Sequence, residues 1–154
     1  MSQAGRPLPD PEYADFAPFW QGTARGELRV PACVRCGRRQ WPPRMACPAC
    51  GGLDFAWSSI GDRGRLYSWT TIGRAMLPGF ESEVPYTVVI VAAEADPRIR
   101  FVGRLDPAHE PPAHELPGIG DPLVAVFVPV EDVVLVYWRP DPGGPVPSAQ
   151  EVQS

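Results

Sequence analysis

The chain has 154 residues, of which 44% are hydrophobic and 21% charged, an ordinary composition for one globular domain or two small ones. The longest apolar stretches, 86–93 and 123–130, are much shorter than the roughly 20 residues of a membrane-spanning helix, and the first residues lack the apolar core of a secretory signal. We therefore expect a cytoplasmic protein without a membrane partner. The net charge of −4 and the pI of about 5.1 weigh against general nucleic-acid binding.

The N-terminal segment is predicted to be a disordered tail, 1–9, followed by one short helix. Asp10 before Pro11 is typical of a helix start, with the aspartate as N-cap, and Gly22 is a plausible stop. Aromatic residues recur between them at helical spacing, which predicts an aromatic stripe on one face. The stripe consists of Tyr13, Phe16 and Trp20, with Phe19 beside it. It either packs on the chain's own core or docks on a partner.

The region after the cysteines is predicted to be strands and turns. Strand-forming residues are concentrated in five segments: 65–72, 86–93, 99–105, 123–130 and 133–138. Five strands in such a short region suggest a small barrel. Segment 106–122, with five prolines and two histidines, is predicted to be a loop, within which Gly118 to Asp121 form a turn. The Pro/Gly/Ser-rich residues 140–154 are expected to be disordered.

The last two predicted strands are apolar on both faces. A strand of a small barrel normally buries one face only, so polar and apolar residues should alternate. Neither 123–130 nor 133–138 shows this alternation. We therefore expect something to cover the outside of the barrel there, and the candidates are the cysteine module, the N-terminal helix or another protein.

The four cysteines form two Cys-x-x-Cys units, Cys33/Cys36 and Cys47/Cys50, separated by ten residues. Two such turns aim four sulfurs at one ion in a tetrahedron, with Zn–S distances of about 2.3 Å. Glycine after each unit, at Gly37 and Gly51, is expected to let backbone N–H groups approach the thiolates. Four thiolates leave no open position for water, so the predicted zinc site is structural.

Other chemistries of the cysteines are weighed against zinc. Structural disulfides do not fit a cytoplasmic chain, and a redox Cys-x-x-Cys normally occurs once, at a helix start in a βαβ unit. Iron in a rubredoxin-type site uses the same four sulfurs, but the short central spacing is more typical of a zinc ribbon.

Two further groups of residues are candidate sites. Four arginines near the cysteines are suited to contact a phosphate group or an acidic partner surface, with a solvated basic patch as the alternative: Arg35, Arg38, Arg39 and Arg44. His109 and His114, next to Glu110 and Glu115, could bind metal or move protons, but a solvated loop is the better interpretation. With all four thiols in the metal site and no serine-nucleophile or phosphate-loop motif, we predict no catalytic residue.

Taken together, these segments resemble the zinc-ribbon/OB-fold acyl-CoA-associated family. The resemblance covers roughly 13–139. It rests on Phe19-Trp20, the cysteine pairs with Pro42-Pro43 between them, and the downstream segments GDRGRLYSWTTI, VPYTVVIVAAE and GIGDPLVAVFVPV. It implies a mainly β fold with an N-terminal helix, a rubredoxin-like zinc ribbon and a five-stranded OB-fold barrel. The expected divisions are 1–27 for tail and helix, 28–55 for the ribbon, 56–139 for the barrel and 140–154 for the tail.

The resemblance also implies a function. Members of this family accompany thiolase-like enzymes, acyltransferases and the aldolases that shorten steroid side chains, and some are paired with enoyl-CoA hydratases. Only the four cysteines carry over residue by residue. The expected role is a non-catalytic subunit of a thiolase-fold enzyme that shares a CoA ester with its partner, with Tyr137, Trp138 or the aromatic stripe as interface anchors.

Two other functions remain as hypotheses. OB barrels and ribbons often bind single-stranded nucleic acid, and Tyr67, Trp69 and Thr71 share one predicted strand face that could stack bases. Core packing explains these residues equally well, and the acidic barrel segment would repel phosphate. An independent enzyme that uses the histidine loop is the weakest hypothesis.

Overall fold

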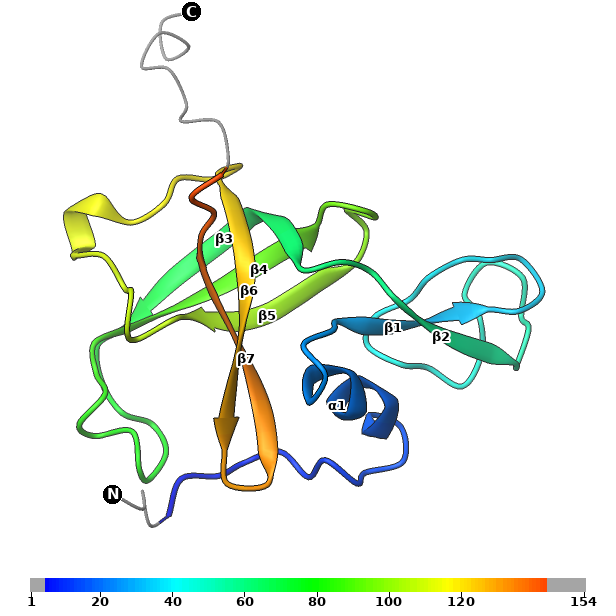
Figure 1. Cartoon of the computed structure of the whole chain (residues 1–154), viewed down its shortest axis with the longest axis horizontal. Helices are drawn as coiled ribbons and strands as arrows, with labels where there is room; N and C mark the ends of the chain where they lie inside the picture. Colours follow the sequence, from blue (N-terminus) through cyan, green and yellow to red (C-terminus); the bar gives the residue numbers. More distant parts are fainter. Residues whose placement is uncertain (1–4, 144–154) are drawn as a thin grey trace, which may run out of the picture.

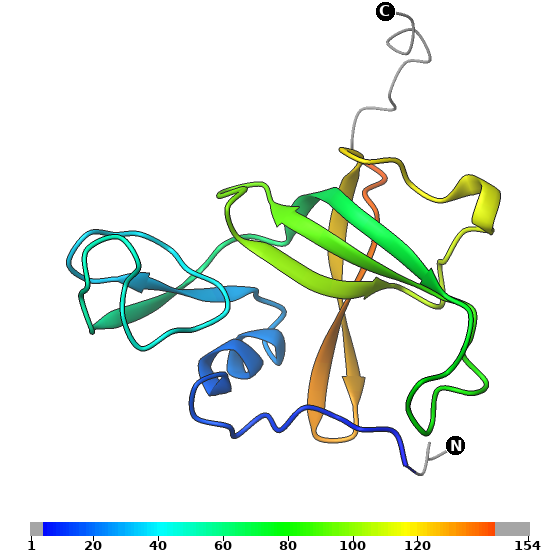
Figure 2. The ribbon, with the colours of Figure 1, turned by 180° about the vertical axis from the view of Figure 1, so that it is seen from behind.

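The computed structural model describes residues 5–143 and consists of a small two-stranded ribbon beside a five-stranded barrel. Both views of the ribbon drawing show the two-stranded unit extending to one side, with the only α-helix between it and the barrel in the part of the chain described (Figures 1 and 2). The predicted mainly β fold is therefore confirmed. The predictions of disorder for 1–4 and 144–154 lie outside the described residues.

The ribbon is built from two short antiparallel strands, β1 (Arg29–Cys33) and β2 (Phe55–Ser59). Arg29 lies opposite Ser59 and Cys33 lies opposite Phe55. The strands therefore bring the first cysteine next to the segment that follows the last one. The polypeptide between the strands makes both cysteine turns.

The helix α1 (Ala17–Thr23) begins later than the sequence pattern predicts. Residues from Asp10 to Phe16 form turns, and Phe16 is the N-cap without any side-chain capping hydrogen bond. Pro18 lies in the first turn of the helix, a position that suits proline because the missing N–H has no helical partner there. The sequence contains two possible helix starts, one at Asp10-Pro11 and one at Pro18. The helix uses the second, so the predicted start at Asp10-Pro11 is wrong.

The barrel is closed in the order β3-β4-β5-β7-β6. Its five strands agree with the predicted segments to within two residues at each end, so the barrel prediction is confirmed. They are β3 (Arg63–Ile72), β4 (Tyr86–Ala93), β5 (Arg100–Leu105), β6 (Pro122–Val130) and β7 (Val133–Pro140). The loop between β5 and β6 contains one 3₁₀ turn, η1 (Ala113–Glu115).

The closure between β5 and β7 is the weakest seam of the barrel. These two strands are parallel and pair only through Arg104 with Tyr137 and Leu105 with Trp138. All other neighbouring pairs are antiparallel and have three or more residue pairs. The earlier parts of β5 and β7 consequently diverge, which leaves room on this side of the barrel.

An aromatic cluster fills that room and joins the three parts of the fold. Phe19 of α1 lies 4.7 Å from Trp41 of the ribbon, ring centre to ring centre, and Trp41 lies 5.2 Å from Phe101 of β5. Phe101 in turn contacts Trp138 of β7, which is almost completely buried. Phe16 also contacts Trp41, and Phe19 and Trp20 pack in or against the chain's own core.

The chain itself covers part of the apolar surface of β6 and β7, as the sequence predicts for one of its candidates. Helix α1 contacts β7, and Phe127 and Val136 pack against the core from partly buried positions. Among the described residues, no large apolar side chain of these two strands is fully exposed. The chain's own helix therefore accounts for part of the predicted cover.

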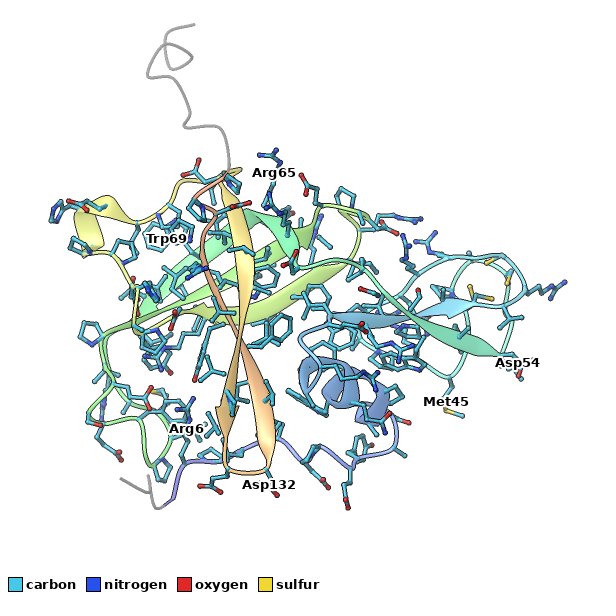
Figure 3. All side chains as sticks on the ribbon, viewed as in Figure 1. Arg6, Met45, Asp54, Arg65, Trp69 and Asp132 are labelled. Carbon is cyan, nitrogen blue, oxygen red and sulfur yellow. The ribbon has the colours of Figure 1, made fainter. Side chains whose placement is uncertain are left out.

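The N-terminal segment is anchored to the barrel at Arg6. Its guanidinium donates hydrogen bonds to Glu83 and to the hydroxyl of Tyr137, each at 3.1 Å, and lies over the ring of Phe80. Gly79 passes so close to the Arg6 backbone that a Cβ atom there would approach it to 2.8 Å. The predicted disorder of 1–9 therefore does not extend to Arg6, which Figure 3 shows near the base of β7.

Candidate functional site

The structure brings the four predicted metal ligands together at the end of the ribbon. Cys33 closes β1, and the turn after it is closed by the Gly37 N–H, which donates to the carbonyl oxygen of Cys33 at 2.7 Å. The second turn repeats this arrangement, with the Gly51 N–H donating to the Cys47 carbonyl at 2.9 Å. Both glycines have positive φ, 75° and 73°, which explains their residue type.

Backbone N–H groups approach the sulfurs of the second unit, as expected. These groups belong to Ala49, Cys50 and Gly52, while Gly37 and Gly51 close the turns through carbonyl oxygens. A Cβ atom on Gly52 would lie 3.0 Å from the Cys33 sulfur. Sequence reasoning missed Gly52, although the Gly-Gly pair after Cys50 is a visible signal for it.

The spacing of the sulfurs fits one tetrahedral ion. All four Sγ atoms lie within 4.8 Å of one another, and the Cys33–Cys50 and Cys36–Cys47 pairs are both 3.6 Å apart. A zinc ion with Zn–S bonds of about 2.3 Å requires sulfurs about 3.8 Å apart. Disulfide bonds need about 2.05 Å, so the observed spacing contradicts the disulfide alternative.

The thiol acidities show what an ion contributes to this cluster. Hydrogen bonds from the Ala49 and Cys50 backbone N–H groups lower the pKa of Cys47 to about 6. The Gly52 N–H also lowers the pKa of Cys50, but burial and the neighbouring sulfurs outweigh it and raise that pKa to about 11. The first thiolate therefore forms readily, and its negative charge disfavours ionisation of the neighbouring thiol. A divalent cation would offset this repulsion between thiolates.

The four arginines of the ribbon do not converge on one point. Arg35 donates to the Cys50 carbonyl oxygen at 3.3 Å and is exposed, as are Arg38 and Arg44. Arg39 is half-buried and its charge acts on Asp96, which belongs to the turn between β4 and β5. Arg44 lines a hollow that it shares with Asp15 and Trp57. At least Arg39 therefore faces the chain's own barrel.

The histidine loop is organised by its acidic residues. Asp106 is buried, and its carboxylate accepts hydrogen bonds from the Ala108 N–H and, at 2.6 Å, from Nδ1 of His109. Glu110 accepts the Thr87 N–H at 2.7 Å. Within residues 5–143, the four cysteines are the only group of three or more potential ligands that could hold a metal, so the histidines do not form one.

The aromatic face expected on β3 is broken by a β-bulge between Leu66 and Ser68. After the bulge Trp69 lies level with Val89, while the ring of Tyr67 is covered by Arg100, whose guanidinium carbon lies 3.7 Å from the ring centre. Figure 3 shows Trp69 on the side of the barrel that faces the loop before β6. Tyr67 and Trp69 therefore do not form the base-stacking platform that the alternation predicted.

Two of the predicted interface anchors are wrong. Trp138 is 1% exposed and Tyr137 is 7% exposed, so neither side chain can reach a partner. Both side chains make contacts within the chain: the Trp138 ring packs against Phe101, and the Tyr137 hydroxyl accepts a hydrogen bond from Arg6. Tyr13 of the aromatic stripe is exposed. Other exposed apolar side chains lie on the ribbon, at Val34, Met45 and Leu53, and in the loop between β3 and β4, at Met76 and Leu77.

A ribbon with four clustered cysteines, packed through one helix on a closed five-stranded barrel, defines the class of zinc-ribbon/OB-fold proteins. Sequence comparison agrees: residues 20–56 match the model for the rubredoxin-like zinc ribbon domain of ChsH2, and residues 57–128 match the model for its C-terminal OB-fold domain. The chain belongs to the ChsH2 zinc-ribbon/OB-fold family.

Solved structures give two relevant matches. A chain described as "Ltp2-ChsH2(DUF35) aldolase" is 25% identical, with a TM-score of 0.72, and the match covers 88% of this chain and 98% of that one. A DUF35 family protein of unknown function from Sulfolobus solfataricus is 14% identical, with a TM-score of 0.52 over 82% of this chain and 87% of that one, and shows the fold alone. No curated protein matches the chain.

Among residues 5–143, no helix is long and apolar enough to cross a membrane.

Proposed function

We propose that the chain is a non-catalytic, acyl-CoA-associated subunit of a heteromeric thiolase-fold enzyme. Its partner would be a thiolase, an acyltransferase or a retro-aldol lyase, with steroid side-chain cleavage among the candidate reactions. In this proposal the chain stabilises the partner and forms part of the channel that holds the CoA moiety. It shares the CoA ester with the partner and supplies none of the reacting groups.

The observation that carries the proposal is the match to a chain of the Ltp2-ChsH2(DUF35) aldolase. The match covers nearly all of that chain, and both ChsH2 domain models match this sequence in the same order. The similarity to that chain therefore extends over the helix, the ribbon and the barrel together, and is not limited to the ribbon or the barrel alone. An aldolase complex is the assembly named for that neighbour, and we extend it to this chain.

The side chains support a non-catalytic role. All four cysteines lie in one cluster, so no thiol of the chain is left as a nucleophile. The Asp106 carboxylate already engages Nδ1 of His109 and the Ala108 N–H, and Glu110 caps the Thr87 N–H. The acidic groups of the histidine loop thus stabilise the conformation of that loop. We assign the reacting groups of the enzyme to the partner.

We also propose one structural zinc ion held by Cys33, Cys36, Cys47 and Cys50. The sulfur spacing supports a tetrahedral ion with four thiolate ligands, which leaves no position for water. The ion would stabilise the ribbon, for which we keep the proposed range 28–55, although its second strand, β2, continues to Ser59. The proposed ranges for the tail and helix, the barrel and the final tail remain 1–27, 56–139 and 140–154.

The exposed side of the ribbon is the proposed contact with the partner or the CoA phosphates. Met45 is 92% exposed and Leu53 is 71% exposed, and exposed apolar groups of this kind are common at interfaces. Figure 3 shows Met45 projecting outward from the ribbon. Three arginines are exposed beside them and would bind phosphate or carboxylate groups: Arg35, Arg38 and Arg44. We include Arg39 in the proposed contact as well, although it is half-buried and its charge also acts on Asp96.

The test is co-expression of the chain with thiolase-fold proteins of the same organism, followed by size-exclusion chromatography. The proposal expects one stable heteromeric complex. Met45→Glu with Leu53→Glu should weaken it, whereas Ile119→Glu, at a 65% exposed apolar position in the loop before β6, should not. A chain that ignores every thiolase-fold protein and instead binds single-stranded nucleic acid tightly would contradict the proposal.

A further inference from the structure

A hollow of about 410 Å³ lies between α1, the ribbon and the diverging parts of β5 and β7. This volume lies in the range of small-molecule sites. Its walls are mainly aromatic, and they come from parts of the chain that are far apart in the sequence. They include Phe19, Trp20, Trp41, Phe80, Tyr86 and Phe101.

The hollow exists because of the weak barrel seam. Strands β5 and β7 pair only at Arg104 and Leu105, so the segments before these residues lie apart. Helix α1 and the Trp41 ring occupy part of the gap from one side. The remaining space is bounded on the other side by Phe80 and Tyr86, whose rings lie 5.9 Å apart, centre to centre.

One end of the hollow carries two guanidinium groups. Arg104 lies over the ring of Tyr86 at 4.4 Å, and Arg6 lies over the ring of Phe80 at 4.8 Å. Both groups bind the same carboxylate, that of Glu83, through its two oxygens. Two cations therefore share one anion, and stacking on the rings fixes the orientation of both guanidinium planes.

The other carboxylates near this end are already engaged. Glu110, which lines an adjoining hollow together with Arg104, accepts the Thr87 N–H at 2.7 Å. Glu81 accepts the Gly79 N–H at 2.8 Å. Neither of them lines the aromatic hollow, and the two arginines that do line it share the single negative charge of Glu83.

Arg104 also has an unused donor. The residue is only 9% exposed, and its Nε atom is buried without a hydrogen-bond partner among the described residues. A buried donor without a partner is destabilising, and it is satisfied when a ligand supplies an acceptor. Arg104 lines the hollow, but Nε itself is buried, so an oxygen atom in the hollow reaches this donor only after the side chain turns toward it.

We propose that this hollow binds a small apolar molecule that carries one carboxylate. The aromatic walls take the apolar body, and the carboxylate binds at the end formed by Arg104 and Arg6. The site belongs to this chain alone, so it goes beyond the proposed subunit role and does not depend on any partner.

The first test compares two probes with the same apolar chain, decanoate and decanol, on the full zinc-loaded chain. Isothermal titration calorimetry gives the affinities, and tryptophan fluorescence reports the site because Trp20, Trp41 and Trp138 line the hollow. Decanoate should bind roughly tenfold or more tightly than decanol, the ratio expected for a charge-assisted hydrogen bond. Arg104→Gln should remove this preference and leave decanol binding unchanged.

A second pair of variants keeps the test valid if Arg104→Gln does not fold. Val102 lines the mouth of the hollow and is 73% exposed, so a change there leaves the core intact. Val102→Glu should weaken decanoate binding, and the neutral Val102→Gln should not; Ile119→Glu controls for the added charge elsewhere. The proposal is overturned if decanoate and decanol bind equally, if decanoate does not bind at millimolar concentration, or if Val102→Glu binds decanoate as well as Val102→Gln.

Discussion

Replacing Gly103 with alanine is predicted to destabilise the barrel at its weakest seam. A Cβ atom at this position would lie 2.7 Å from Cδ1 and 2.8 Å from Nε1 of Trp138. The indole is 1% exposed and lies against Phe101, so it cannot move aside without disturbing the aromatic cluster. The glycine therefore allows β5 and β7 to approach at the point where their pairing begins.

The size of the effect follows from two opposing contributions. Adding a methyl group to a packed core costs about 1–3 kcal/mol, and replacing a strand glycine with alanine returns about 0.5–1 kcal/mol through the unfolded state. The net loss should be about 1–2 kcal/mol. For a chain of this length that corresponds to a decrease in Tm of roughly 2–8 °C.

Thermal unfolding followed by circular dichroism measures this decrease, with Gly73→Ala as the matched control. A Cβ atom at Gly73 would meet nothing within 4 Å, and its φ is not in the left-handed region, so this variant should be as stable as the natural chain or slightly more stable. If Gly103→Ala unfolds at the same temperature as Gly73→Ala, the close approach of Gly103 and Trp138 is wrong.

Three further predictions concern the metal centre, the turn before β5 and the arginines. Elemental analysis should find one zinc per chain, and Cys47→Ser should lose it and unfold the ribbon; iron at that level, or a folded ribbon without metal, would contradict this. Arg98 holds the pKa of Asp96 below its usual range, so Asp96→Asn should destabilise the chain at neutral pH. That difference should disappear as the pH falls through the lowered pKa of Asp96, and a constant difference would refute the ion pair. Neutralising the four ribbon arginines should weaken binding of the partner or the CoA ester and reduce the dependence of that binding on salt concentration. If the affinity is unchanged, the arginines form only a solvated basic patch without a role in binding.

The sequence was sufficient for the strands and the cysteine cluster because their signals are local. β-Branched and aromatic runs bounded by turn residues marked all five barrel strands, and two Cys-x-x-Cys units marked the cluster. The start of α1 was mispredicted because Asp10-Pro11 and Pro18 are both acceptable starts locally. With the start near Pro18, Phe16 and Phe19 pack on Trp41. This is a tertiary contact, which the local sequence does not reveal.

The features that sequence reasoning missed depend on residues far apart in the chain. Arg6 binds Glu83 and Tyr137, from which it is separated by 77 and 131 positions. The parallel contact of β5 with β7, which buries Tyr137 and Trp138, is likewise invisible in an apolar pattern. The sequence pattern therefore places both residues at an interface, because apolar strand faces alone do not show which element covers them.

The central claim is that the chain acts as the non-catalytic subunit of a thiolase-fold enzyme. The most direct measurement is turnover of a panel of CoA esters by the chain alone, by the co-purified partner alone and by their complex. The account predicts that the isolated chain is inactive and that full activity requires the complex. Turnover of a CoA ester by the isolated, zinc-loaded chain would contradict it.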